Sequence, residues 1–238
     1  MIRTVITLIT VGVSTLIASL LTIIASIFGP YSRAVYYIST YWTKILLISA
    51  GVKLEIFGLE NIDKNKSYIF VGNHQSHFDV PAVFSILPFT ARFMTKKELF
   101  KIPVFGWAMK AAGTIKIDRS DHSQSIASMN EALEKIKNGV SVIIFPEGTR
   151  SADGKIGPFK KGGFVLAIKG EIPIIPVSIS GSRFILPKHS LRVNPGKIKL
   201  VFGEPISTIG LTYQDREKLS EKTRKFIIDN FETHYNEN

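Results

Sequence analysis

Residues 73–79, "NHQSHFD", concentrate polar side chains that can move protons or bind metals. The stretch holds two histidines, an asparagine, a serine and an aspartate. The apolar runs "SYIFVG" and "VPAVFSIL" flank it on either side. This composition fits three kinds of structure: a metal site, a histidine–aspartate pair acting as a general base, or the capped start of a helix.

The first interpretation is a metal site. His74, His77 and Asp79 are suitable ligands, but a catalytic zinc usually takes three protein ligands with a supporting shell. The other three histidines, at positions 122, 189 and 234, have no second ligand clustered beside them. We therefore expect no resident metal.

The second and third interpretations both place Asp79 at the start of a helix. As a cap, Asp79 would precede Pro81, which is tolerated in a first helical turn. As part of a base pair, Asp79 would meet His74 across the turn that follows a strand ending at Gly72. The carboxylate would then fix the imidazole tautomer and leave the other ring nitrogen free to accept a proton from a hydroxyl.

A second polar cluster, "FPEGTR" at 145–150, follows the apolar run "SVIIF". Pro146 cannot continue a central strand, so Glu147, Gly148, Thr149 and Arg150 are expected at a strand end, where open α/β sheets bind their ligands. Glycine permits close backbone approach, and the arginine fork suits a phosphate or carboxylate. Residues 151–163 form a glycine-containing loop with three lysines.

The elements that must position these clusters alternate between strands and helices. Amphipathic spacing predicts a helix between Ser120 and Gly139, and a charged helix is expected over Asp215–Asn230. Together with the strands, they predict an α/β domain with a layered mixed sheet flanked by helices. The expected strands are 52–58, 67–72, 91–95, 113–118, 141–145, 172–180 and 197–203.

The first fifty residues differ from the rest of the chain. Thr4–Phe28 runs 25 residues without a charge, which as a helix would reach ~37 Å and could cross a bilayer core. Ala34–Gly51 is apolar but interrupted by Lys44, and its tyrosines and tryptophan favour the headgroup level. We predict an N-terminal two-helix membrane hairpin over 1–50 and the α/β domain over 51–238. A cleaved signal peptide and a buried hairpin of a soluble protein are the alternatives.

Charge and composition narrow the partners. The net charge is +11, with three basic residues and no acid in residues 1–50, which leaves 27 basic and 19 acidic residues, or +8, for the remainder. Such a surplus favours nucleic acid or an anionic membrane. The apolar N-terminus favours the membrane, and we expect no nucleic acid because no aromatic–basic stacking face is visible. The absence of cysteine excludes disulfides and a cysteine nucleophile.

Four blocks in order resemble the 1-acylglycerol-3-phosphate acyltransferase family of glycerolipid acyltransferases. "NHQSHFD" is similar to its NHx4D motif, and residues 145–150 to its FPEGTR motif. "GTIKIDR" at 113–119 resembles a third block, with Lys116 where an aromatic or aliphatic residue is common. "IPIIPVSISG" at 172–181 resembles the family's proline-containing strand. The resemblance extends from about residue 52 to 205.

The resemblance implies transfer of a fatty acyl group from a thioester to the sn-2 hydroxyl of lysophosphatidic acid, giving phosphatidic acid. The donor would be acyl-CoA or acyl carrier protein, with no resident cofactor. His74 is then the general base and Asp79 its orienting partner. Since the acceptor is itself the nucleophile, no acyl-enzyme is needed and Ser76 is not the expected nucleophile; a Ser76 acyl-enzyme is the alternative.

The remaining polar residues would bind substrate. We assign Arg119 and Arg150 to the acceptor phosphate and Glu147 to the glycerol part or to bracing Arg150. Gly148 and Thr149 belong to the same turn, and Lys96 is a further candidate for anionic groups. We expect a bacterial inner membrane location with the active site on the cytoplasmic side. A lyso-ornithine lipid acceptor is the nearest alternative, and a membrane-anchored metal-dependent hydrolase, separable by a chelator, is a more distant one.

Overall fold

A seven-stranded mixed sheet organises the computed structural model, which describes residues 1–117 and 122–235. The strand order is β1-β7-β6-β2-β5-β3-β4. Five neighbours, β6, β2, β5, β3 and β4, are parallel, while β7 runs antiparallel to β6 and parallel to β1. The strands are β1 Val52–Phe57, β2 Ile69–Gly72, β3 Ala91–Lys96, β4 Ile115–Ile117, β5 Ser141–Ile144, β6 Ile174–Ser180 and β7 Gly196–Phe202.

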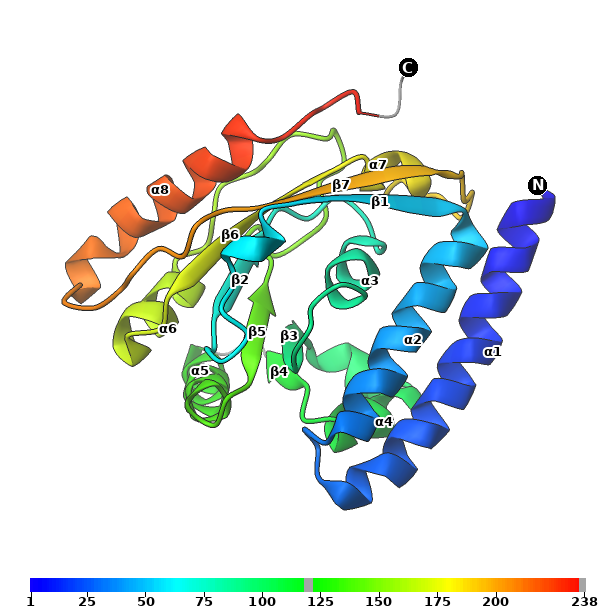
Figure 1. The fold of residues 1–238 in the computed structure, drawn as a ribbon, viewed down its shortest axis with the longest axis horizontal. Helices are drawn as coiled ribbons and strands as arrows, with labels where there is room; N and C mark the ends of the chain where they lie inside the picture. Colours follow the sequence, from blue (N-terminus) through cyan, green and yellow to red (C-terminus); the bar gives the residue numbers. More distant parts are fainter. Residues whose placement is uncertain (118–121, 236–238) are drawn as a thin grey trace.

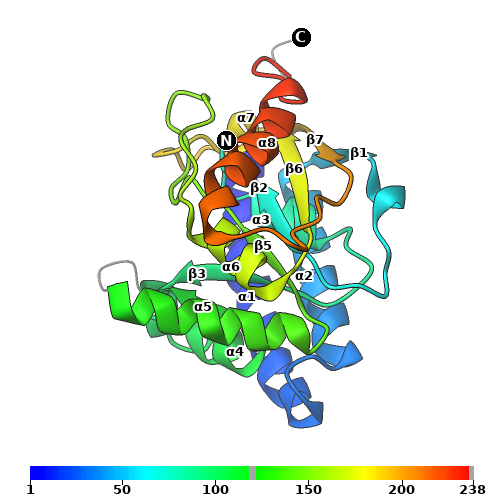
Figure 2. The same ribbon diagram turned by 90° about the vertical axis from the view of Figure 1, so that its left-hand side faces the viewer.

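Helices cover both faces of the sheet (Figure 1). Helices α2 and α3 pack on one face, with α1 outside α2, and α5, α6 and α8 lie on the other, where Figure 2 shows α5 and α8 in front of the sheet. The helices are α1 Ile2–Ala25, α2 Arg33–Ala50, α3 Asp79–Phe84, α4 Phe105–Ala111, α5 His122–Lys137, α6 Gly162–Gly170, α7 Ser182–Ile185 and α8 Arg216–Asp229. Short 3-10 turns occupy Ser26–Phe28, Leu59–Asn61, Lys97–Lys101 and Tyr213–Asp215.

The three central strands are buried along their whole length. Every residue of β2, β5 and β6 is buried, because helices cover both of their faces. This is why their sequences are continuously apolar rather than alternating. The α/β prediction is confirmed, and each of the seven expected strands is present, most of them shorter by one to three residues.

The two expected helices are also present. Helix α5 is followed by Gly139, whose φ of +87° is a left-handed conformation that favours glycine. Asp121, expected near the start of α5, lies outside the described residues. Helix α8 begins one residue later and ends one residue earlier than predicted.

Helix α1 has an inverted amphipathic pattern. Its buried residues are Thr7, Ser19, Thr22 and Ala25, whereas its large aliphatic side chains, such as Ile9 and Ile17, are exposed. In water this arrangement would be unfavourable, since burial normally removes apolar surface from solvent. Within the described residues, Ile2–Phe28 is the one helical segment long and apolar enough to cross a membrane.

Helix α2 belongs partly to the core of the domain. Leu47 and Ala50 pack in the same apolar cluster as strands β2, β6 and β7, while Tyr37 and Tyr41 are exposed on the other side. A Ser32 cap and left-handed Gly51 delimit the helix. The expectation that 1–50 forms a separate anchoring unit therefore stays a prediction.

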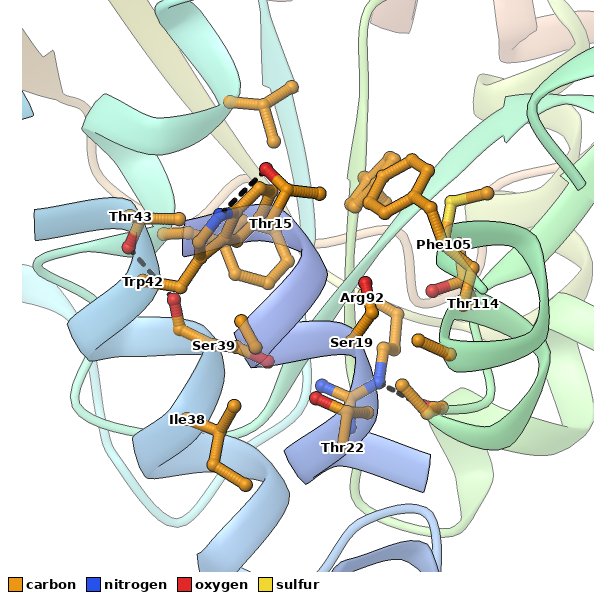
Figure 3. Close-up of a pocket in the computed structure, with 17 residues that line it drawn as sticks. Thr15, Ser19, Thr22, Ile38, Ser39, Trp42, Thr43, Arg92, Phe105 and Thr114 are labelled. Carbon is orange, nitrogen blue, oxygen red and sulfur yellow. Dashed lines mark hydrogen bonds between the residues drawn. The ribbon is translucent and has the colours of Figure 1, made fainter. Parts of the chain in front are cut away.

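A buried arginine attaches the N-terminal helices to the domain (Figure 3). Arg92, only 3% exposed, donates to the carbonyl of Pro30 in the α1–α2 turn and to that of Ala112 at the end of α4, and it lies over the Tyr31 ring. Hydroxyls from α1 and α2 point into the small cavity of about 70 Å³ beside it. Burial lowers the pKa of Arg92 to about 10, so its guanidinium remains charged at neutral pH.

Candidate active site

The polar clusters meet at the carboxyl ends of the parallel strands. His74 follows β2, Glu147 follows β5, and Lys96 ends β3, so all three emerge at one edge of the sheet. β4 ends at Ile117 on the same edge, although Arg119 itself lies outside the described residues. Lys96 is exposed, and its assignment to substrate stays a prediction.

His74 and Asp79 form the central pair. His74 Nδ1 lies 2.7 Å from Asp79 Oδ2, and the same oxygen accepts the backbone N–H groups of Gln75 at 2.7 Å and Ser76 at 2.8 Å. The Asp79 side chain is fully buried, whereas that of His74 is 19% exposed and stacks on Phe145. With Nδ1–H donated to the carboxylate, Nε2 has the lone pair needed to accept a proton.

The interpretation of Asp79 as a helix cap is wrong. Asp79 is the first residue of α3, the N-cap is Phe78, and no side chain caps the helix. The carboxylate instead accepts from the loop before it, because that loop folds back over the helix start. The turn thus holds the imidazole and carboxylate together, as the base-pair interpretation requires.

The neighbouring polar residues of the turn are structural. Asn73 is buried and exchanges two 2.8 Å hydrogen bonds with the backbone of Ile179 on β6. The hydroxyl of Ser76 donates to the carbonyl of Leu186 at 3.0 Å and is also buried. These contacts fix the loop that presents His74, and they occupy the Ser76 hydroxyl.

Glu147 connects the two polar loops. One of its carboxylate oxygens accepts the N–H of His74 at 2.8 Å and the other that of Gly157 at 3.1 Å. Burial raises the pKa of Glu147, and the two backbone donors partly oppose that shift. Glu147 therefore holds the backbone of the His74 loop, and its expected contact with glycerol or Arg150 stays a prediction.

Arg150 and Glu147 line a polar cavity of about 460 Å³. Lys155, Lys160 and Lys188 also line it, together with the exposed Thr149. Ser151 N donates to the carbonyl of His74 at 2.8 Å, which keeps this cavity next to the imidazole. Asp153 lines the cavity too, but the four cations outnumber the two carboxylates, which suits a phosphate group.

An apolar cavity of about 290 Å³ opens on the other side of the FPEGTR turn. Phe145, which stacks on His74, and Gly148 both line it, and the φ of +78° at Gly148 is one that a side chain would strain. Its remaining lining is mostly aliphatic or methionine side chains from β3, β4, β5, α5 and α6. The site thus has a polar and an apolar compartment, which share Lys160 and which contact His74 through Glu147 and Phe145 respectively.

Two residues near the site were not assigned to it from the sequence. His77, which the sequence presented only as a metal ligand, is exposed on one side; partial burial, Arg150 and His74 lower its pKa, while Asp79 acts in the opposite direction. Lys188 donates to the carbonyl of Arg150 at 2.7 Å from a loop 38 residues away. Sequence spacing held no signal for Lys188. Across 1–117 and 122–235, no three His, Asp or Glu side chains gather as a metal site would require.

Comparison with known proteins identifies the class. Residues 53–180 match the Acyltransferase family, which is more than half of the chain. The chain therefore belongs to the acyltransferase family, and the resemblance predicted from its motifs is confirmed. A crystal structure of the 1-acyl-sn-glycerophosphate (LPA) acyltransferase PlsC from Thermotoga maritima is similar, with a TM-score of 0.71 and 28% identity over 92% of this chain and 97% of that one.

Several relatives in sequence are named 1-acyl-sn-glycerol-3-phosphate acyltransferases. The chain is 37% identical to a chloroplastic 1-acyl-sn-glycerol-3-phosphate acyltransferase of Brassica napus over 76% of this chain and 53% of that protein. It is 35% identical to the 1-acyl-sn-glycerol-3-phosphate acyltransferase of Saccharomyces cerevisiae over 87% of this chain and 69% of that protein. The chain spans about half the length of the chloroplastic relatives it matches.

Proposed function

We propose that the protein transfers a fatty acyl group from an acyl thioester to the sn-2 hydroxyl of lysophosphatidic acid, giving phosphatidic acid for phospholipid biosynthesis. The observation that carries the proposal is the 2.7 Å contact between His74 Nδ1 and Asp79 Oδ2 beside a cation-lined cavity. The names of the relatives in sequence and structure support the same substrate.

The geometry accounts for each proton. His74 Nε2 accepts the proton of the sn-2 hydroxyl as its oxygen attacks the thioester carbonyl, and the buried Asp79 carboxylate stabilises the imidazolium that forms. When the tetrahedral intermediate collapses, the C–S bond breaks and the imidazolium returns the proton to the departing thiolate. The lipid hydroxyl is the nucleophile, so no acyl-enzyme is required.

The two compartments divide the substrates between them. Arg150 binds the acceptor phosphate in the polar compartment, to which Lys155, Lys160 and Lys188 also contribute charge. The assignment of Arg119 to the same phosphate rests on its sequence motif alone. The apolar cavity bounded by Phe145 and Gly148 takes a fatty acyl chain.

Membrane attachment completes the proposal. The exposed aliphatic face of α1 supports an anchoring role for residues 1–50, with α2 joining the anchor to the α/β domain. We place the protein at the bacterial inner membrane with the active site on the cytoplasmic side, where acyl-CoA and acyl carrier protein are both available as donors. Both substrates then meet at the headgroup level.

The test is an assay of the full chain in detergent with lysophosphatidate and each donor in turn, measuring phosphatidate. His74→Ala should abolish turnover, while His234→Ala, which changes a histidine that lines neither cavity, keeps it. Near-normal kcat in His74→Ala would remove the base assignment. Faster acylation of a lyso-ornithine lipid would show that this lipid, and not lysophosphatidate, is the acceptor. Loss of turnover with a chelator would favour metal chemistry.

A further inference from the structure

The loop of residues 186–195, "LPKHSLRVNP", has the composition of a membrane-contact segment. It connects α7 to β7, and no acidic residue occurs anywhere between positions 172 and 203. Leu191 is 74% exposed, and the exposed residues His189 and Arg192 flank it. An isolated leucine exposed among basic groups combines apolar insertion with attraction to anionic headgroups.

This loop is joined to the first turn of the apolar helix α1 (Figure 1). Val193 N donates to the Thr4 hydroxyl at 3.1 Å, and that hydroxyl lies 3.4 Å from the Val193 carbonyl. Beside Thr4, Ile2 and Val5 are 79% and 55% exposed. The exposed aliphatic face of α1 and the 186–195 loop are therefore neighbours.

The other end of the same loop is joined to the active site. The carbonyl of Leu186 accepts the Ser76 hydroxyl at 3.0 Å, and Lys188 Nζ donates to the carbonyl of Arg150 at 2.7 Å. Lys188 also lines the polar cavity. One segment of ten residues thus connects the apolar helix, the histidine loop and the arginine turn.

We propose that the 186–195 loop is a second membrane-contact element, which docks on an anionic bilayer surface with Leu191 inserted at the headgroup–acyl boundary. Charge complementarity and continuity with the exposed face of α1 select the bilayer as the partner. Docking places the mouth of the Arg150 cavity at the headgroups of the leaflet.

The cysteine-free chain allows a direct test by site-specific labelling. Leu191→Cys carries an environment-sensitive fluorophore in the full chain, reconstituted into vesicles of equal parts phosphatidylglycerol and phosphatidylcholine. Ile209→Cys is the matched control, because Ile209 is 73% exposed but follows the opposite end of β7 (Figure 1). Spin-labelled lipids should quench the label at 191 and not at 209, while aqueous iodide should do the reverse.

Charge dependence is measured with the same label. In the Leu191→Cys protein, Arg192→Gln should weaken docking of the loop roughly fivefold in vesicles containing phosphatidylglycerol, whereas Lys222→Gln on α8 leaves it unchanged. Vesicles of phosphatidylcholine alone should show little effect of either substitution. Unchanged thermal unfolding verifies that the variants fold.

Equal lipid quenching at 191 and 209, or a label at 191 that iodide reaches freely in vesicles, would overturn the proposal. An equal response to Arg192→Gln and Lys222→Gln would show that anionic headgroups are not the partner of the loop. Neither readout requires acyl transfer, so failure here is distinguishable from failure of the proposed function.

Discussion

Asp79→Asn tests the mechanism with minimal change of shape. The asparagine carbonyl oxygen can occupy the position of Oδ2 and keep the three N–H donors, from His74, Gln75 and Ser76, that the carboxylate now accepts. The reverse orientation would direct an NH₂ group at two backbone N–H groups. The variant therefore retains the local geometry but loses the negative charge.

Losing the negative charge raises the free energy of the transition state more than that of the ground state. In the proposed mechanism His74 is neutral before proton transfer and cationic after it, so the missing carboxylate matters most once the imidazolium forms. Two unit charges about 4 Å apart interact by about 4 kcal/mol at an effective dielectric constant of ~20, which corresponds to roughly 10³-fold in kcat. Weaker hydrogen bonds to two backbone N–H groups should lower the free energy of unfolding by about 2 kcal/mol.

The assay compares kcat and KM for lysophosphatidate in the wild type, Asp79→Asn and the control Asp63→Asn, whose aspartate is on the surface. We expect kcat to fall and KM to change little in Asp79→Asn, with both constants unchanged in the control. If Asp79→Asn folds and keeps a kcat within about threefold of wild type, the carboxylate does not stabilise an imidazolium and the proton-transfer scheme is refuted.

Three further predictions follow from contacts around the site. Arg150→Ala should raise KM for lysophosphatidate roughly 10- to 100-fold with a smaller change in kcat, because a charged hydrogen bond to phosphate is lost; an unchanged KM contradicts that role. The lowered pKa of His77 means that the folded state binds its proton less readily than the unfolded state, so the stability associated with a neutral His77 is present above pH 6.5 and is lost as pH falls below it. Thermal unfolding of His77→Gln should accordingly be less sensitive than wild type to a change from about pH 7.5 to about pH 5.5, and equal sensitivity would contradict this linkage. Arg92→Met should lower the free energy of unfolding, measured in a denaturant titration, by about 2–4 kcal/mol. The reason is that the carbonyls of Ala91, Ala112 and Pro30 lose their donor. A change below about 0.5 kcal/mol would show that Arg92 does not hold the helices to the domain.

The sequence alone was informative where local pattern determines structure. Continuous β-branched runs predicted the central strands, because a strand covered on both faces must be apolar throughout. A strand end was predicted before His74 and another before Glu147, and both are present. The parallel pairing of β2 with β5 then brings the two clusters to one edge of the sheet. The five-residue spacing of His74 and Asp79 was compatible with a contact but also with a cap.

The tertiary structure decided between the contact and the cap for Asp79, because only the folded turn brings two backbone N–H groups and the imidazole to a single carboxylate oxygen. It also turned the hydroxyls of α1 inward, a pattern that an uncharged run of residues does not reveal, since the buried face of a helix depends on what packs against it. Lys188 reaches Arg150 through a loop distant in sequence, and contacts of that kind depend on chain topology rather than on local periodicity. The chemistry available to this protein was therefore readable from residue types and spacing. The positions of the Glu147 carboxylate, of the N-terminal helices and of the 186–195 loop depended on the packing of the whole chain.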